Sequence, residues 1–460
     1  MDTAIVFDPA LIRKYDRSGP RYTSYPTAVQ FSPAVGAADY VQAARASNAA
    51  GRPLSLYFHI PFCARVCFYC ACNKIITANR KRAEPYVARL KQEIAQQGAL
   101  YDRSRKVVQL HWGGGTPTFL SDAQMAEVMQ ATAEHFHLLD DDSGDYSIEI
   151  DPREVDADTI AQLRGLGFNR MSLGVQDFDP EVQRAVNRIQ PKELTLATLE
   201  AARAVGFRSI NLDLIYGLPR QTVASFARTL DAVLEAAPDR LSVFNYAHLP
   251  ELFKSQRQIR GEELPSPAEK LEILKLVIAR LTEAGYVYIG MDHFARPDDP
   301  LAVAQQSSTL HRNFQGYSTH ADCDLVAMGM TAIGMLEGMY IQNAKDLETY
   351  YGHLDRGELP VVRGVALDGD DRLRREIITR LICDFALDSA AVERHHGIVF
   401  ADYFATELAE LREMAADGLL TLSAERITVS PAGRLLIRNI CMVFDRYLRQ
   451  AQEQRFSKVI

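Results

Sequence analysis

The chain has 460 residues, of which 47% are hydrophobic and 24% charged, and this is the composition of an ordinary globular protein. It excludes disordered, collagen-like and disulfide-scaffold proteins, and the length suits one large domain with a smaller one. The formal net charge is −8, so no general basic field exists for nucleic acid or an anionic membrane, and an anionic substrate has to be bound by local cations.

Residues 1–53 are expected to form an arm and a lead-in to the first strand. Within it, residues 11–25 read LIRKYDRSGPRYTSY, in which Gly19-Pro20 predicts a turn. The first residues contain no basic stretch that leads into an apolar one, and no apolar run is long enough to span a bilayer. We therefore expect a cytoplasmic protein.

From residue 54, short β-type runs alternate with amphipathic stretches. The seven candidate strands are residues 54–60, 107–112, 146–150, 170–176, 210–216, 241–247 and 286–293. The candidate helices between them are residues 84–97, 122–135, 158–166, 192–205, 223–234 and 267–283. This alternation predicts an α/β domain over residues 54–360 that is a parallel β/α barrel, partial with about six βα units. An open doubly wound sheet is the alternative, and both folds place chemistry at the carboxyl ends of the strands.

After residue 360 the alternation stops. Residues 371–385, 401–416 and 431–450 are expected to be helical, and residues 419–429 are expected to form a hairpin. We predict that residues 361–460 form a mainly helical C-terminal domain.

Four of the seven cysteines fall within ten residues, directly after the first candidate strand. The segment 57–72 reads YFHIPFCARVCFYCAC, which spaces the cysteines as C-x3-C-x2-C-x-C. Thiolates suit zinc or an iron–sulfur centre, and a zinc site that uses all four thiolates is the alternative. Zinc ribbons divide their ligands into two separated pairs, whereas these four follow one strand, so the spacing favours an iron–sulfur cluster with one open iron.

The C-x3-C-x2-C motif after a first strand resembles the radical S-adenosylmethionine (SAM) superfamily. The resemblance implies one [4Fe-4S] cluster per chain, whose open iron binds SAM. One electron from the cluster would then cleave SAM to methionine and a 5'-deoxyadenosyl radical. The next strand ends in Gly113-Gly114-Gly115, which resembles the glycine-rich element that contacts the methionyl end of SAM.

Further segments resemble, within that superfamily, the family of oxygen-independent coproporphyrinogen III oxidases. They are SGPRYTSYPT at 18–27, the cysteine loop, GMDHFARP at 290–297 and RNFQGY at 312–317. The resemblance implies oxidative decarboxylation of two propionates of coproporphyrinogen III to vinyls, which gives protoporphyrinogen IX in heme biosynthesis. It also implies Cys63, Cys67 and Cys70 as cluster ligands, with Cys72 nearby but not ligating.

The same resemblance implies two SAM molecules in one site. The residues that it places in contact with SAM are Tyr57, Tyr69, Gly114, Gly115, Thr116, Glu149, Gln176, Arg188, Asp213, Ala247 and Ile333. An electron donor and an electron acceptor are also required, and the sequence identifies neither. We expect a monomer that binds neither nucleic acid nor a membrane.

Because the substrate would carry four propionates and the chain is acidic, we expect local cations to bind it. The candidates, as a hypothesis, are the arm residues Arg13, Lys14, Arg17 and Arg21 together with Arg296 and Arg312. The arm would fold over the mouth of the barrel, and the alternative is a solvated basic stretch.

Two other functions remain open at this point. One is a related radical SAM heme-binding chaperone without oxidase activity, although the arm and the fourth cysteine are present here as in the oxidases. The chaperone's compact HNxxYW element is not matched by residues 311–317, which read HRNFQGY. The other function is a non-enzymatic zinc-binding interaction protein, which metal analysis would reveal.

Overall fold

The computed structural model describes residues 5–450 and divides into two compact units. The first, which we call the sheet unit, comprises Gln30–Glu269 and Asp322–Ala366. The second, the C-terminal unit, comprises the arm up to Val29, the segment Lys270–Ala321 and the chain from Leu367 onward. The sequence predicted three consecutive segments instead, and the observed units interleave them because residues 270–321 pack with the C-terminal helices. Gln305, for example, donates hydrogen bonds to the carbonyl oxygens of Ile289 and Cys383.

The centre of the sheet unit is a run of parallel strands. Its strands, in their spatial order, are β9 (Arg240–Asn245), β8 (Ser209–Tyr216), β7 (Arg170–Gln176), β6 (Asp145–Ile150), β4 (Lys106–Gly114), β1 (Leu54–Ile60) and β14 (Asp324–Met328). All neighbouring pairs in this run are parallel. From β1 to β9 the spatial order follows the chain order, without the reversal that defines a doubly wound sheet. The expected partial β/α barrel is therefore confirmed.

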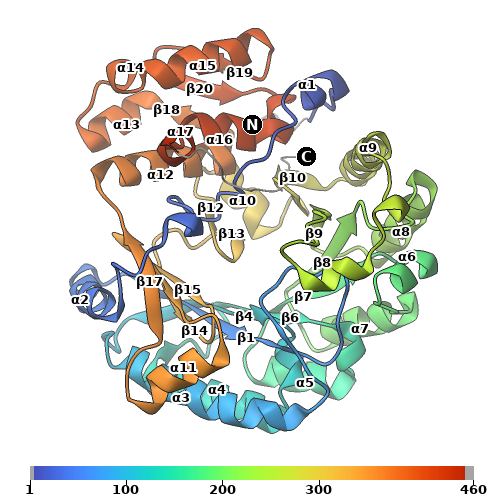
Figure 1. The fold of residues 1–460 in the computed structure, drawn as a ribbon, viewed down its shortest axis with the longest axis vertical. Helices are drawn as coiled ribbons and strands as arrows, with labels where there is room; N and C mark the ends of the chain where they lie inside the picture. The colour runs from blue at the N-terminus through green and yellow to red at the C-terminus, as the bar shows by residue number, and fades with distance from the viewer. Residues whose placement is uncertain (1–4, 451–460) are drawn as a thin grey trace. The chain divides into compact units, whose positions relative to one another are not determined.

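Helices follow the strands and cover the outer, convex face of this curved sheet (Figure 1). They are α3 (Ala83–Gly98), α4 (Asp122–His135), α5 (Ala157–Gly165), α6 (Pro180–Ala185), α7 (Lys192–Ala204) and α8 (Val223–Ala236). Local signals set their ends: Ser121 caps α4, accepting a hydrogen bond from the backbone N–H of Gln124, whose side chain returns one to Ser121. The predicted bounds of α3, α4, α5, α7 and α8 agree with the structure to within a few residues, whereas α6 was not predicted.

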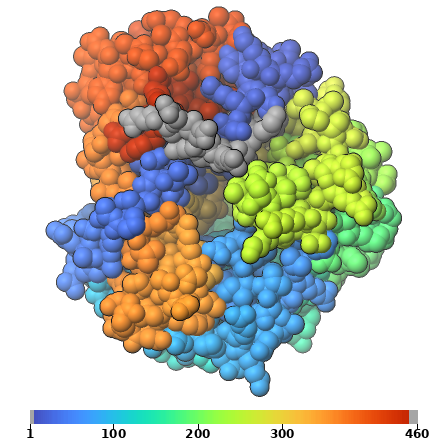
Figure 2. Space-filling view, in the orientation of Figure 1, coloured from blue at the N-terminus to red at the C-terminus, as the bar shows by residue number. Residues whose placement is uncertain are grey.

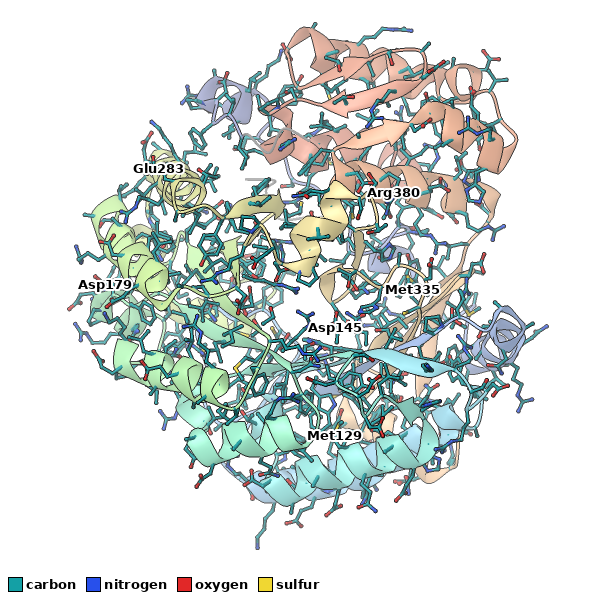
Figure 3. The ribbon with its side chains drawn as sticks, turned by 180° about the vertical axis from the view of Figure 1, so that it is seen from behind. Met129, Asp145, Asp179, Glu283, Met335 and Arg380 are labelled. Carbon is teal, nitrogen blue, oxygen red and sulfur yellow. The ribbon has the colours of Figure 1, made fainter. Side chains whose placement is uncertain are left out.

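Alternation along β6, β7 and β8 separates an apolar outer face from a polar inner face. In β7 the side chains of Met171, Leu173 and Val175 are buried, whereas those between them are only half-buried. Ion pairs such as that between Asp145 and Arg170, with 2.7 Å between their nearest atoms, lie at the amino ends of the strands (Figure 3). The opposite, carboxyl ends are where parallel barrels place their chemistry.

Beyond β1 the sheet continues into strands that the sequence did not predict. After β14 come β15 (Ile333–Leu336), β16 (Met339–Asn343) and β17 (Val361–Ala366), which are antiparallel to their neighbours. The remaining elements of the sheet unit are α2 (Ala37–Ser47), β2 (Phe62–Cys63), β3 (Ile75–Ile76), β5 (His137–Leu138) and α11 (Leu347–Asp355).

The C-terminal unit joins the arm to helices and small antiparallel sheets. The arm contains α1 (Pro9–Lys14), and the middle segment contains α9 (Pro267–Glu283), α10 (Pro300–Gln306) and the hairpin β12 (His311–Asn313) with β13 (Gly316–Ser318). The C-terminal segment comprises α12 (Gly369–Asp384), β18 (Ala386–Asp388), α13 (Ser389–His396), α14 (Phe400–Tyr403), α15 (Ala405–Ala416), β19 (Leu420–Leu422), β20 (Arg426–Val429), α16 (Ile437–Val443) and α17 (Arg446–Gln450). The predicted hairpin at residues 419–429 is confirmed as the antiparallel pair of β19 and β20.

Two predicted elements were wrong in form. Residues 286–293 do not form one strand but are divided between a tight antiparallel pair, β10 (Val287–Gly290) and β11 (His293–Ala295), because Gly290 and Met291 both adopt positive φ and reverse the chain. The helix expected over 431–450 is interrupted between α16 and α17. In the described part of the chain, no helix combines the length and apolarity needed to cross a bilayer.

Candidate active site

Polar side chains of neighbouring strands lie in register on the inner face of the sheet. Tyr57 on β1 pairs with His111 on β4, and His111 pairs with Ser147 on β6. Two residues further along β6, Glu149 pairs with Ser172 on β7. Because side chains two residues apart share one face of a strand, both rows project to the same side. The rings of Tyr57 and His111 stack there, with their centroids 5.8 Å apart.

The cysteine loop starts where β1 ends and is tied down along its length. It is closed by β2 and β3, which pair in parallel. Lys74 Nζ and Ser255 Oγ both donate to the carbonyl oxygen of Cys70, each at 2.9 Å. Gln256 Nε2 donates to the carbonyl oxygen of Tyr69, also at 2.9 Å. Ser255 and Gln256 belong to a short 3-10 helix after β9, and these hydrogen bonds place it against the cysteine loop, which is distant from it in sequence (Figure 2).

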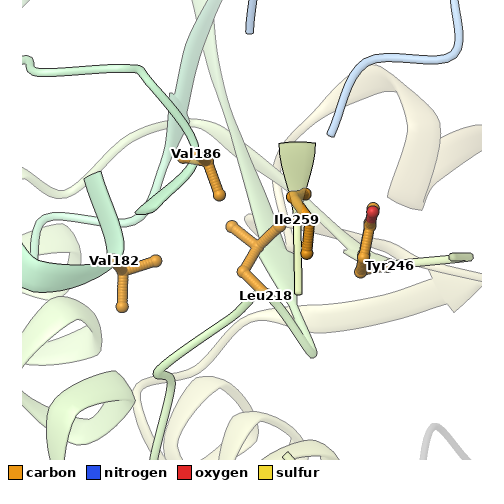
Figure 4. Close-up of a cluster of buried hydrophobic side chains, with 5 residues drawn as sticks. All are labelled: Val182, Val186, Leu218, Tyr246 and Ile259. Carbon is orange, nitrogen blue, oxygen red and sulfur yellow. The ribbon is translucent and has the colours of Figure 1, made fainter. Parts of the chain in front are cut away.

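The same loop packs against an apolar cluster, whose buried side chains are drawn in Figure 4. Its buried members are Val182, Val186, Leu218, Tyr246 and Ile259, and the aromatic rings of Phe68 and Tyr69 pack against them. The backbone N–H of Phe68 donates to the carbonyl oxygen of Val186 at 2.9 Å. Burying these two rings fixes the backbone between the second and third cysteines of the motif.

Cys67 is the most deeply placed of the four cysteines, with 8% of its surface exposed. Two guanidinium groups reach its sulfur: Arg153 Nη2 and Arg188 Nη1 each lie 3.6 Å from Sγ. Asp151 holds both arginines, accepting from Arg153 Nη2 at 2.7 Å and from Arg188 Nη1 at 3.1 Å. Two cationic N–H donors therefore surround the sulfur of Cys67.

The other cysteines have different surroundings. Thr116 Oγ1 donates to Cys63 Sγ at 3.5 Å, although burial dominates and raises the pKa of Cys63 to about 11. A hydrogen bond with Cys72 and the charge of Lys74 together lower the pKa of Cys70, despite its burial. Cys72 is exposed, whereas Cys63 and Cys70 are half-buried. Cys72 is therefore distinguished from the three cysteines of the C-x3-C-x2-C motif by its exposure.

The glycine loop after β4 lies directly against the end of β1. The backbone N–H of Gly115 donates to the carbonyl oxygen of Ile60 at 2.8 Å, and a Cβ at Gly115 would lie 2.7 Å from the carbonyl oxygen of Phe62. Gly114 has a φ of +112°, and a Cβ there would lie 2.6 Å from the His59 ring. Both positions therefore require glycine.

Two carboxylates on the inner face have opposite pKa shifts. Burial alone would raise the pKa of Glu149, but His111 at 3.5 Å and the backbone N–H of Gly114 at 3.1 Å outweigh it, and the pKa is lowered. Burial raises the pKa of Asp213 to about 6, against the hydrogen bonds that Ser172 and Asn211 donate to it, each at 2.8 Å. Both side chains are acceptors at neutral pH.

Most residues predicted to contact SAM gather around these groups. Arg188 is buried, and its Nη2 donates to the carbonyl oxygen of Gly174 at 2.6 Å. Gln176 ends β7 with a φ of +68°, and Ala247, two residues after β9, accepts a hydrogen bond from Gln256 at 3.2 Å. Ile333 starts β15 and pairs with Gln342. No hydrogen bond or ring contact among the described residues links Ile333 to the others.

Sequence reasoning missed several residues that form hydrogen bonds with the cysteine loop. Asp151 and Arg153 follow β6 directly, and their position at a strand end was the only signal available. Lys74, Ser255 and Gln256 carry no motif. His59, by contrast, is satisfied as a structural histidine: Nδ1 meets Tyr57 Oη and Nε2 meets the carbonyl oxygen of Asn73, both at 3.1 Å.

The cations expected to bind substrate all lie in the C-terminal unit, and several have protein partners. Lys14 pairs with Asp417 at 2.5 Å, Arg21 pairs with Asp292, and Arg17 donates to the carbonyl oxygen of Asn439 at 3.3 Å. Arg13 is exposed and Arg296 half-buried. Arg312 differs from these: it is buried over the Tyr317 ring, and its Nε and Nη1 have no hydrogen-bond partner among residues 5–450.

Comparisons with known proteins give a consistent picture. The Radical SAM superfamily model matches residues 57–233, and the HemN C-terminal domain model matches residues 367–436. The chain is 57% identical to the oxygen-independent coproporphyrinogen III oxidase of Pseudomonas aeruginosa over the full length of both proteins. It is 54% identical to that of Escherichia coli over 99% of both. The solved structure of coproporphyrinogen III oxidase from Escherichia coli, described as a radical SAM enzyme, covers 96% of this chain and is covered completely by it, with 51% identity and a TM-score of 0.92.

Proposed function

The chain belongs to the oxygen-independent coproporphyrinogen III oxidases of the radical SAM superfamily, and from that premise we propose which residues bind the cluster, SAM and the substrate. Cys63, Cys67 and Cys70 hold one [4Fe-4S] cluster, and SAM completes the coordination of its open iron. The reaction converts two propionates of coproporphyrinogen III to vinyls and yields protoporphyrinogen IX for heme biosynthesis. The full-length identity to oxidases does not favour the related heme-binding chaperones.

The donor set of the cysteine loop fits a cluster better than a single zinc ion. Tetrahedral zinc brings its sulfur ligands to about 3.8 Å from one another. Within residues 5–450, the only three potential ligands whose atoms all lie within 4.8 Å of one another are Glu376, His395 and His396, which are remote in sequence from the loop. The three thiols of the C-x3-C-x2-C motif do not all lie within 4.8 Å of one another, whereas the sulfur ligands of one zinc ion would. This spacing is the observation that supports the proposed cluster.

When bound, the cluster supplies the electron that cleaves SAM into methionine and a radical able to take a hydrogen atom from the propionate carbon beside the pyrrole. The protein's part is to bind and orient. Arg188 forks onto a carboxylate through guanidinium N–H groups, and the acceptors Glu149 and Asp213 receive ribose hydroxyls. The ring of Tyr69 packs against the apolar cluster. In the proposed complex it would also pack on the adenine of SAM.

We extend the SAM site to two molecules, which matches two decarboxylations per substrate. Its proposed contacts are Tyr57, Tyr69, Gly114, Gly115, Thr116, Glu149, Gln176, Arg188, Asp213, Ala247 and Ile333, with Cys72 near the cluster as a non-ligand. Residues 54–360 would carry the cluster and SAM. Residues 1–53 would form the arm and the lead-in, and residues 361–460 a mainly helical C-terminal domain.

Of the six cations proposed to bind the substrate propionates, Arg312 has the best structural support. A buried guanidinium with two unpartnered N–H groups carries a desolvation cost, and a carboxylate would offset it through charge-assisted hydrogen bonds. Arg13, Lys14, Arg17, Arg21 and Arg296 would add longer-range attraction. We further propose a cytoplasmic monomer that uses a one-electron donor and a separate electron acceptor, and that binds neither nucleic acid nor membrane.

The reaction itself tests this proposal. Protein reconstituted with iron and sulfide is incubated anaerobically with SAM, a low-potential reductant and coproporphyrinogen III, and the products are separated by chromatography. We expect protoporphyrinogen IX together with 5'-deoxyadenosine. Deoxyadenosine without any change in the porphyrinogen would refute the proposed substrate, and zinc without iron in the purified protein would refute the proposed cluster.

A further inference from the structure

Cys67 differs from the other proposed cluster ligands in the donors that surround its sulfur. Cys63 Sγ has a hydroxyl donor, Thr116 at 3.5 Å. Cys67 Sγ instead has two cationic donors, Arg153 and Arg188, each at 3.6 Å. These distances lie within the range of hydrogen bonds to sulfur, which is a larger and softer acceptor than oxygen.

Arg153 is fixed in this position and has little freedom to turn away. Its Nε donates to Asp151 Oδ1 at 2.9 Å and its Nη2 to Oδ2 at 2.7 Å, a bidentate pair. Its side chain is 7% exposed and that of Asp151 is 11% exposed, so water screens neither group well. Asp151 also accepts from Arg188 at 3.1 Å, so one carboxylate orients both guanidinium groups toward the sulfur.

We propose that Arg153 is a redox-tuning residue, which donates a charge-assisted hydrogen bond to the Cys67 thiolate and thereby makes the cluster easier to reduce. One-electron reduction by a low-potential reductant adds a negative charge to the cluster and its sulfurs. A nearby positive N–H donor stabilises that added charge, and hydrogen bonds to the sulfurs are an established control of cluster potential. Arg153 would thus act on the step that precedes SAM cleavage, without touching substrate.

The inference rests on the proposed function, because it requires Cys67 to be a cluster ligand. Arg188 is not the residue to vary, since its proposed role at the SAM carboxylate would confound the result. Arg153 has no other proposed role, and the structure offers a matched control. Arg80 is also an arginine of the sheet unit, but it is half exposed, donates to Glu154 at 2.6 Å and to the carbonyl oxygen of Phe119 at 2.7 Å, and does not reach a cysteine.

The test is an EPR-monitored redox titration of the loaded proteins in the absence of SAM, with iron content measured in parallel. In Arg153→Gln we expect full iron content and a midpoint potential that is more negative by at least a tenfold change in the reduction equilibrium, or 59 mV for one electron. Arg153→Lys, which keeps the charge but loses the fork, should lie between Arg153→Gln and the native protein. Arg80→Gln should titrate like the native protein.

Each outcome has a separate meaning. A loaded Arg153→Gln cluster with the native potential overturns the tuning role, and so does an equal shift in Arg80→Gln, because the effect would then be a general loss of charge. If Arg153→Gln does not retain iron, the decision falls to Arg153→Lys, whose native potential would likewise overturn the proposal. Full iron content in Cys67→Ala would instead refute the proposed ligand set.

Discussion

Arg312 shows how a single buried charge can predict a ligand. Its Nε and Nη1 lack hydrogen-bond partners among the described residues, although the side chain is buried against Tyr317. A hydrogen bond to a charged group is worth about 1.5–3 kcal/mol, so replacing this arginine should weaken binding of the propionate by at least about tenfold. In Arg312→Gln we expect the KM for coproporphyrinogen III to rise by that factor, with SAM cleavage in the absence of substrate unchanged.

Arg356→Gln is the matched control for this prediction. Arg356 is exposed and pairs with Glu358 at 2.7 Å, a surface ion pair of small energetic value. Its loss removes the same charge but should leave the KM as it is. Steady-state kinetics of both variants under anaerobic conditions make the comparison, and an unchanged KM in Arg312→Gln would contradict a role for Arg312 in binding.

At this scale the sequence predicted the groups that motifs mark and missed those that contact them from distant segments of the chain. The cysteines and the glycine turn could be proposed because their spacing follows from the chemistry that we assign to them. Arg153, Ser255 and Gln256 were missed because each contacts the cysteine loop from a segment distant in sequence. A strand-end position was the only sign of Arg153.

At the scale of elements, a buried carboxyl ties helix α3 to the antiparallel end of the sheet. Glu93 is fully buried and accepts hydrogen bonds from the backbone N–H of Gly329 at 2.8 Å, from Asn343 at 2.7 Å and from Tyr350 at 2.5 Å. These bonds join α3 to the turn after β14, to β16 and to α11. Burial outweighs the three donors and raises the pKa of Glu93 to about 7.

This pKa predicts a pH-dependent stability. The pKa of Glu93 in the folded protein lies above that of a glutamate in the unfolded chain. The contribution of Glu93 to the free energy of unfolding is therefore complete below about pH 4.5 and is lost as the pH rises through 7. In Glu93→Gln that contribution is absent. We expect the native protein to lose roughly 2–3 kcal/mol of unfolding free energy relative to Glu93→Gln between pH 5 and pH 8. Urea titrations of both proteins at the two pH values measure this difference. A difference that is constant with pH would contradict the raised pKa.

The strands with a clear period were predicted, and the strands that were missed have none. The alternation in β6, β7 and β8 has period two, with the polar face toward the site. In β14 all five residues are buried, so no alternation marks it, and Gly-containing β15 gives a weak signal. The pair β10–β11 was predicted as one strand because the reversal depends on the positive φ of Met291, and a methionine gives no sequence signal for a turn.

At the scale of the whole molecule, the arm belongs to the C-terminal unit and is held there by specific contacts. Tyr22 Oη donates to Asp445 at 3.0 Å, and Tyr25 Oη accepts from the backbone N–H of Arg446 at 3.1 Å. Deletion of residues 1–25 should lower porphyrinogen turnover by at least about tenfold, because it removes four of the proposed substrate cations. Iron content and reductive SAM cleavage should persist, since every proposed cluster and SAM residue lies in the sheet unit.

The full-length variant Arg21→Gln is the control for a loss of turnover that is caused only by instability of the truncated protein. It removes the ion pair with Asp292 and leaves the rest of the arm in place. It should reduce turnover in the same direction, by a smaller factor. Normal turnover in both variants would show that the arm does not bind substrate.

The proposed ligand set is tested most directly by the iron content and EPR signal of two single variants, Cys70→Ala and Cys72→Ala, after anaerobic reconstitution. The cysteines lie two residues apart in one loop, so each serves as the other's control. We predict that Cys72→Ala keeps about four irons per chain and a reduced-cluster signal that changes when SAM is added, whereas Cys70→Ala loses both. A full cluster in Cys70→Ala, or its loss in Cys72→Ala, would contradict the proposed ligand set.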